Sequence, residues 1–61
     1  MYPQNLKVGD RILRNGEWLI VQDVMVFPQN SVVLVFALPP SGEVTAYRYQ
    51  MDDILWDVYR P

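Results

Sequence analysis

The sequence predicts an all-β protein in which five short antiparallel strands form one small barrel or meander over residues 1–61. Residues with β-branched and aromatic side chains dominate every apolar run, and such side chains favour strands. Turn signals at residues 15–16, 28–30 and 39–42 separate these runs. No run repeats its apolar residues at the spacing of an amphipathic helix. We therefore expect a single β domain, since a chain of 61 residues is too short for a second one.

The first two strands are predicted on either side of the pair Asn15-Gly16. The run 10–14 (DRILR) precedes this pair and the run 17–27 (EWLIVQDVMVF) follows it. A type I′ hairpin turn needs a positive φ angle at both central residues, and Asn and Gly adopt that conformation most readily. The two runs are therefore expected to pair as an antiparallel hairpin.

Two proline-containing breaks delimit the third and fourth strands. The break 28–30 (PQN) precedes a strand predicted over 31–38 (SVVLVFAL), and the break 39–42 (PPSG) precedes one over 43–50 (EVTAYRYQ). Proline removes a backbone donor and glycine relieves the turn, so neither break is expected to continue a strand. The chain should therefore run back and forth as a meander.

The end of the chain carries the one candidate for a helical turn. In the run 50–55 (QMDDIL) an aspartate can cap a short turn, so we expect a 3-10 turn there. A last short strand is predicted over 56–59 (WDVY). This completes the five strands.

Five short strands with one helical turn before the last resemble the SH3-like small barrel, and the resemblance covers the chain from Lys7 to Tyr59. The opening LKVGDRI followed by GEWLIVQDV also resembles small uncharacterised proteins of actinobacteria and their phages. Many small barrels use a VGD sequence to turn into their first strand. The resemblance therefore implies a fold and no particular activity.

The composition argues against several kinds of chemistry. The chain has no Cys and no His, which removes disulfides, thiolate metal sites and the commonest general base. No basic and apolar leader opens the chain, and no apolar run reaches the roughly 18–20 residues that span a bilayer. We therefore expect a cytoplasmic, non-enzymatic protein that uses no cofactor and does not enter a membrane.

The second and third strands are apolar on both faces. Regular alternation places Trp18, Ile20, Gln22, Val24 and Val26 on one face of the second strand. The remaining residues from Leu19 to Phe27 then take the other face. Continuous apolar runs normally mean that both faces of a strand are covered. Either strong bending, with Trp18, Trp56 and residues 1–3 on the outside, covers both faces, or these strands present a surface for self-association or for a partner, or one of the two runs is not a strand.

The fourth strand changes its apolar face near Ala46. Thr45, Tyr47 and Tyr49 lie opposite Val44 and Ala46 by alternation, and Arg48 continues the Val44 side. This switch predicts either a bulge or sharp bend near residue 46, or a strand with small residues inside and both tyrosines outside. In either case at least one tyrosine hydroxyl should stay near water.

We predict a protein-binding accessory or regulatory module, of phage origin and with a homodimer as one form of self-association. Tyr, Trp and Arg are enriched where protein interfaces bind most strongly. The predicted contact residues are Trp18, Phe27, Phe36, Tyr47, Arg48, Tyr49 and Trp56.

The alternative is a nucleic-acid-binding barrel in which Tyr47, Arg48 and Tyr49 stack on bases. The net charge of −2 and the acidic group formed by Asp52, Asp53 and Asp57 disfavour it, because they repel phosphates. The same three aspartates lack the spacing and the glycine of a calcium loop. We therefore expect them to cap a turn and face solvent, without binding a metal.

Overall fold

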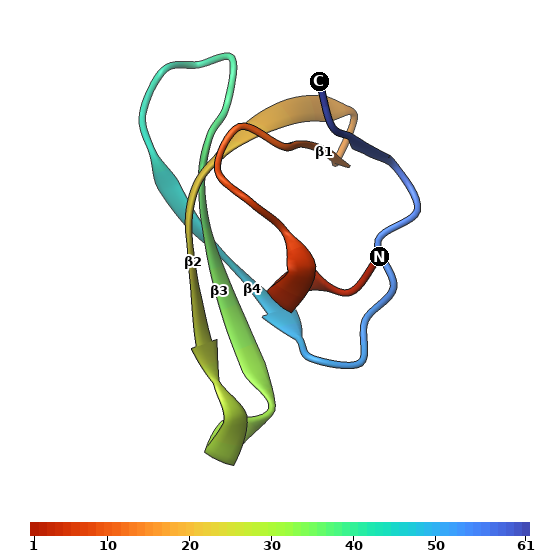
Figure 1. Ribbon diagram of the computed structural model, residues 1–61. Helices are drawn as coiled ribbons and strands as arrows, with labels where there is room; N and C mark the ends of the chain where they lie inside the picture. The colour runs from red at the N-terminus through yellow and green to blue at the C-terminus, as the bar shows by residue number, and fades with distance from the viewer.

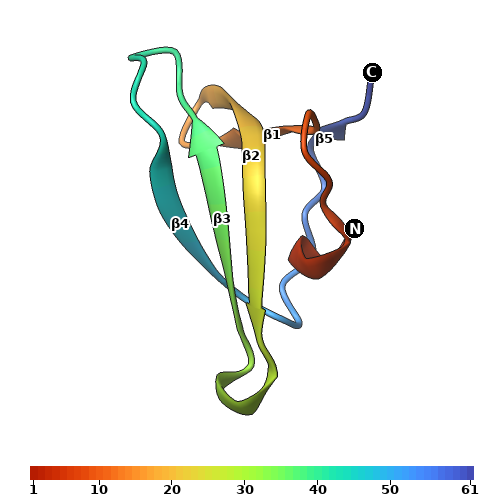
Figure 2. The ribbon, with the colours of Figure 1, turned by 60° about the vertical axis from the view of Figure 1, so that its left-hand side comes forward.

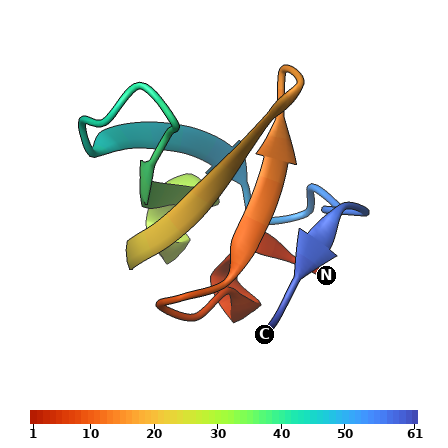
Figure 3. The ribbon, with the colours of Figure 1, turned by 90° about the horizontal axis from the view of Figure 1, so that it is seen from above.

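The computed structural model describes all 61 residues and confirms the predicted all-β class. The strands are β1 (Arg11–Arg14), β2 (Glu17–Phe27), β3 (Val32–Leu38), β4 (Thr45–Gln50) and β5 (Val58–Tyr59). They form one antiparallel sheet in the order β4-β3-β2-β1-β5 (Figure 1). The first four strands form a meander, and the chain then returns to place β5 beside β1. The sheet curls but does not close, because β4 and β5 remain its two borders (Figure 3).

Both 3-10 turns lie outside the run 50–55, where the sequence predicted one. They are η1 (Pro3–Asn5) and η2 (Pro28–Asn30), and each begins with a proline, whose fixed φ suits the first position of a helical turn. The Asp53 carboxylate accepts a hydrogen bond at 2.8 Å from the Gln50 N–H and so closes the end of β4. That aspartate therefore ends a strand and caps no helix.

A bulge in β2 changes the face assignment made from regular alternation. Val21 pairs with Ala37 and Asp23 pairs with Phe36, so Gln22 is an extra residue in the ladder. A bulge adds one residue to one strand and increases its bend. Beyond Gln22 the predicted faces of β2 are therefore exchanged, and Val24 shares a face with Val21.

Two local conformations set the geometry of β1. The Val21 carbonyl accepts a hydrogen bond from the Gly9 N–H, and the Val21 N–H donates to the Asp10 carbonyl. Gly9 and Asp10 together therefore oppose the single residue Val21. Gly9 has φ +94°, which only glycine adopts readily, and this explains the VGD sequence before β1. At the other end, Asn15 (φ 51°) and Gly16 (φ 79°) form the predicted hairpin turn.

The core lies on the inner face of the curled sheet. Side chains that alternate along the strands meet there, and Val21, Val33, Val35 and Ala37 have no exposed surface. The turn η1 packs against β2 and β3 (Figure 2). Leu6, which follows η1, belongs to the same core. Partly buried side chains complete it: Val24, Tyr47, Tyr49, Met51, Leu55 and Val58.

Candidate functional site

The side of the sheet opposite the core forms the candidate site, and we call it the outer face. The register of the strands places alternate residues there, between the core residues of each strand. Most of these residues are apolar. The outer face consists of Arg11, Leu13, Trp18, Ile20, Asp23, Met25, Phe27, Val32, Leu34, Phe36, Leu38, Ala46, Arg48, Gln50 and Tyr59.

Most apolar side chains of the outer face keep contact with water. Trp18 is 47% exposed, Met25 is 45% exposed and Leu13 is 39% exposed. Leu34, Phe36 and Leu38 of the central strand β3 are only partly buried. The sheet therefore buries most of the inner face, on which Val26 is nevertheless 40% exposed, whereas Val32 is the one buried side chain of the outer face and its other apolar side chains keep contact with water.

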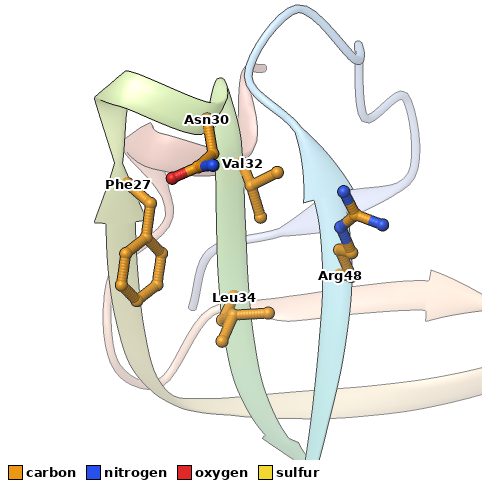
Figure 4. A pocket seen from close by; sticks show the side chains of 5 residues that line it. All are labelled: Phe27, Asn30, Val32, Leu34 and Arg48. Atoms are coloured by element: carbon orange, nitrogen blue, oxygen red, sulfur yellow. The ribbon is translucent and has the colours of Figure 1, made fainter.

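A shallow hollow of about 280 Å³ lies at one end of the outer face. Phe27 of β2 and Leu34 of β3 form its apolar sides, and Val32 lies between Leu34 and the η2 end of the strand (Figure 4). Asn30 and the guanidinium of Arg48 provide its polar groups. The hollow can therefore take an apolar side chain together with a group that accepts hydrogen bonds from arginine.

A second hollow lies at the opposite end of the outer face. One part of it, about 290 Å³, is lined by Arg11, Trp18 and Tyr59. An adjoining part of about 330 Å³ shares Arg11 and Trp18 and extends to Ile20, Leu38 and the residues Pro39, Pro40 and Gly42. Like the first hollow, it combines apolar walls with one arginine.

The charges are distributed unevenly over the molecule. Arg11 and Arg48 are the two cations of the outer face, and Asp23 is its one carboxylate. The other carboxylates are not among the outer-face residues; Asp52, Asp53 and Asp57 follow β4 in the segment before β5, where the Asp57 carbonyl accepts a hydrogen bond from the Leu13 N–H. The outer face is thus slightly positive although the chain has a net charge of −2.

Four of the seven predicted contact residues lie on the outer face: Trp18, Phe27, Phe36 and Arg48. Trp56 is 82% exposed and belongs to the segment between β4 and β5, next to Asp57, whose carbonyl accepts a hydrogen bond from the Leu13 N–H of β1; it is not among the residues that the register places on the outer face. Tyr47 and Tyr49 lie on the inner face and pack against the core. The predicted residues therefore do not form one continuous surface.

The expectation of a bulge near Ala46, or of tyrosines outside, is wrong. The strand β4 pairs with β3 in an unbroken register, so Tyr47 and Tyr49 face inward and Ala46 and Arg48 face outward. The physical reason is Arg14, whose guanidinium carbon lies 5.1 Å from the ring centre of Tyr47 and 5.0 Å from that of Tyr49. This cation–π contact covers the two rings at the open side of the sheet.

The sequence reasoning missed Arg11, Ile20, Leu34 and Leu38 as residues of the candidate site. Leu34 and Leu38 alternate with Phe36 in β3, so the period of the strand was a sufficient signal for both. Arg11 and Ile20 are paired with each other across β1 and β2. The Asn15-Gly16 hairpin fixes that pairing, and the signal was therefore also present in the sequence.

The one strong ion pair lies away from the outer face. Asp10 is only 2% exposed, and the Arg60 guanidinium donates to both of its carboxylate oxygens, at 2.9 Å and 2.8 Å. These hydrogen bonds hold the pKa of Asp10 below its ordinary value; burial opposes this effect and a hydrogen bond from the Lys7 N–H reinforces it. The same pair raises the pKa of Arg60. Its role is to tie the end of the chain to the loop before β1.

The acidic side chains do not gather in a group of three that could hold a metal ion. No helical segment of the protein has the length and apolar character needed to cross a bilayer. No protein-family model, no curated protein and no solved structure matches this chain.

Proposed function

We propose that the protein is a non-enzymatic binding module whose outer face docks a segment of a partner protein. The observation that carries the proposal is the uncovered apolar surface of β1, β2 and β3, which includes Trp18 at 47% exposure. Contiguous exposed apolar surface on a small protein usually marks an interaction site. Removing apolar surface from water gives about 25 cal/mol per Å², so covering this face would stabilise a complex.

The two arginines define the chemistry of the partner segment. Arg48 stands at the hollow beside Phe27 and Leu34, and Arg11 stands at the other hollow beside Trp18. Arginine presents a planar set of donors that matches a carboxylate. The fitting segment therefore carries apolar side chains for the hollows and Asp or Glu residues for the arginines.

A random peptide library displayed on phage tests this proposal with a defined probe. Immobilised wild-type protein should enrich sequences that combine Leu, Ile or Phe with Asp or Glu. The double variant Trp18→Ser with Leu34→Ser should lose that enrichment, and Trp56→Ser, which removes an exposed aromatic side chain that is not among the outer-face residues, should retain it. A library that gives no enrichment, or the same sequences with the double variant, would overturn the proposal.

Nucleic-acid binding through Tyr47, Arg48 and Tyr49 is the alternative. Its geometry is unfavourable, because the tyrosines pack against the core under Arg14 and Arg48 projects from the other face. We expect a fluorescent single-stranded oligonucleotide to show no binding at low salt, where phosphate contacts are strongest. Binding that weakens steeply with added salt would favour the alternative.

A further inference from the structure

The strand β4 leaves one edge of the sheet open. It pairs only with β3, and Figure 2 shows it at the border of the sheet with no segment beyond it. The Met51 N–H donates to the Ser31 carbonyl at 2.9 Å, which fixes the phase of the ladder. Because antiparallel partners exchange hydrogen bonds at every second residue, Thr45, Tyr47 and Tyr49 direct their backbone groups toward β3.

The backbone groups of the even-numbered residues therefore point away from the sheet. At Gln50 they are already used, because its N–H donates to the Asp53 carboxylate and its carbonyl accepts from the Asp53 N–H. Ala46 and Arg48 have exposed side chains and no partner for their outward N–H and C=O groups. Val44, directly before the strand, continues the same phase and is 53% exposed. Three consecutive pairs of donors and acceptors thus remain free.

From this edge we infer a homodimer in which β4 of a second copy pairs antiparallel with β4, about a two-fold axis at Ala46. In this register Ala46 faces Ala46 of the second copy, and Val44 faces Arg48 of the second copy. Each facing pair can exchange two N–H···O bonds, so all three free residues of both copies are satisfied. The two sheets then form one continuous sheet, with an isologous contact between identical surfaces.

Two neighbouring self-pairing registers are less favourable. An axis at Arg48 would set the two arginines directly opposite each other, and like charges in that position are destabilising. An axis at Tyr47 would pair Val44 with Gln50 of the second copy, whose N–H already donates to Asp53.

A second copy is the occupant that this edge fits best. Proteins usually protect border strands with proline, charged side chains, a bulge or a very short strand; β4 has no proline, no lysine and no bulge, and Arg48 is its one charged side chain. The opposite border is different, because β5 is only two residues long. An interface formed by one pair of short strands is small, and small interfaces belong to weak complexes. Dimers should therefore form at high micromolar concentration and above.

Sedimentation velocity between about 10 μM and about 1 mM tests the dimer. Wild-type protein should change from monomer to dimer over this range. Ala46→Pro removes an N–H that points away from β3, so the fold should persist while the dimer dissociation constant rises at least about tenfold. The control Ala46→Ser keeps the N–H and should dimerise like wild type. A wild-type monomer throughout, or equal dimerisation of Ala46→Pro, would overturn the inference.

A charge pair at position 46 tests the register and remains informative if the proline variant fails to fold. Ala46→Lys and Ala46→Glu should each be monomeric, because the axis brings like charges together. An equal mixture of the two should form heterodimers at least as readily as wild type forms its dimer. Strong self-association of Ala46→Glu alone would indicate pairing with Arg48 and would overturn the Ala46-centred axis.

The dimer and the proposed partner site share only Arg48 and can fail separately. The edge pairing engages the backbone of β4, whereas the outer-face hollows are formed mainly by β1, β2 and β3. The double variant Trp18→Ser with Leu34→Ser should therefore dimerise like wild type. If it became monomeric while Ala46→Pro remained dimeric, self-association would occur through the outer face and the edge pairing would be wrong.

Discussion

The two faces of β3 are equally apolar and yet differ in how the molecule uses them. Val33, Val35 and Ala37 point inward and have no exposed surface, whereas Leu34, Phe36 and Leu38 alternate with them and remain partly exposed. A chain of 61 residues can curl one sheet around one core, but it has no further element to cover the outside. The inner face therefore accounts for stability, and the outer face is available for binding.

The largest predicted effect separates the two faces directly. Leu19→Ala removes a core side chain that is 2% exposed and should lower the free energy of unfolding by about 2–5 kcal/mol. Leu34→Ala makes the same chemical change on the outer face, where the side chain already contacts water, and should cost clearly less. Urea denaturation of both variants measures the difference. Equal losses would mean that the outer face is also part of the core.

A smaller effect concerns the Asp10–Arg60 pair and depends on pH. Because the pKa of Asp10 is lowered in the folded state, its contribution to stability is complete above the ordinary carboxyl pKa of about 3.9. The contribution is lost as the pH falls through the lowered pKa. Asp10→Asn should therefore be less stable than wild type at neutral pH, and the gap in urea midpoints should shrink on acidification. A gap independent of pH would contradict this role.

The smallest effect compares two arginines on opposite faces. Arg14→Ala removes the cation above the Tyr47 and Tyr49 rings and should destabilise the protein by about 0.5–1 kcal/mol. Arg48→Ala should leave stability nearly unchanged, since Arg48 projects from the outer face. The same urea measurement serves both variants. A larger loss for Arg48→Ala would assign the structural role to the wrong arginine.

The succession of strands and turns along the chain could be predicted from the sequence, because the turns contain residue types that favour turn conformations. Asn15 and Gly16 adopt the positive φ angles that their residue types favour, and the register of β1 with β2 follows from them. The bulge at Gln22 could not be predicted, because a single inserted residue leaves no compositional signal. Regular counting beyond it therefore assigned Val24 and Met25 to the wrong faces.

The candidate site was predictable only in part, for a related reason. Trp18, Phe27, Phe36 and Arg48 project from one face, as strand alternation and the register require. Tyr47 and Tyr49 were misplaced because their cover comes from Arg14, a charged residue thirty-three or more positions away in the chain. Local patterns do not reveal which distant side chain will cover a ring.

Methyl NMR of the folded protein gives the most direct test of the central claim, which is that the inner face stabilises the fold and the outer face binds a partner. The probe is the peptide most enriched from the phage library by wild-type protein. On its addition, the methyl signals of Leu34 and Leu38 should shift, and those of Val33 and Val35 should stay nearly unchanged. Shifts confined to the segment 51–57, or an absence of any shift at saturating peptide, would contradict docking on the outer face.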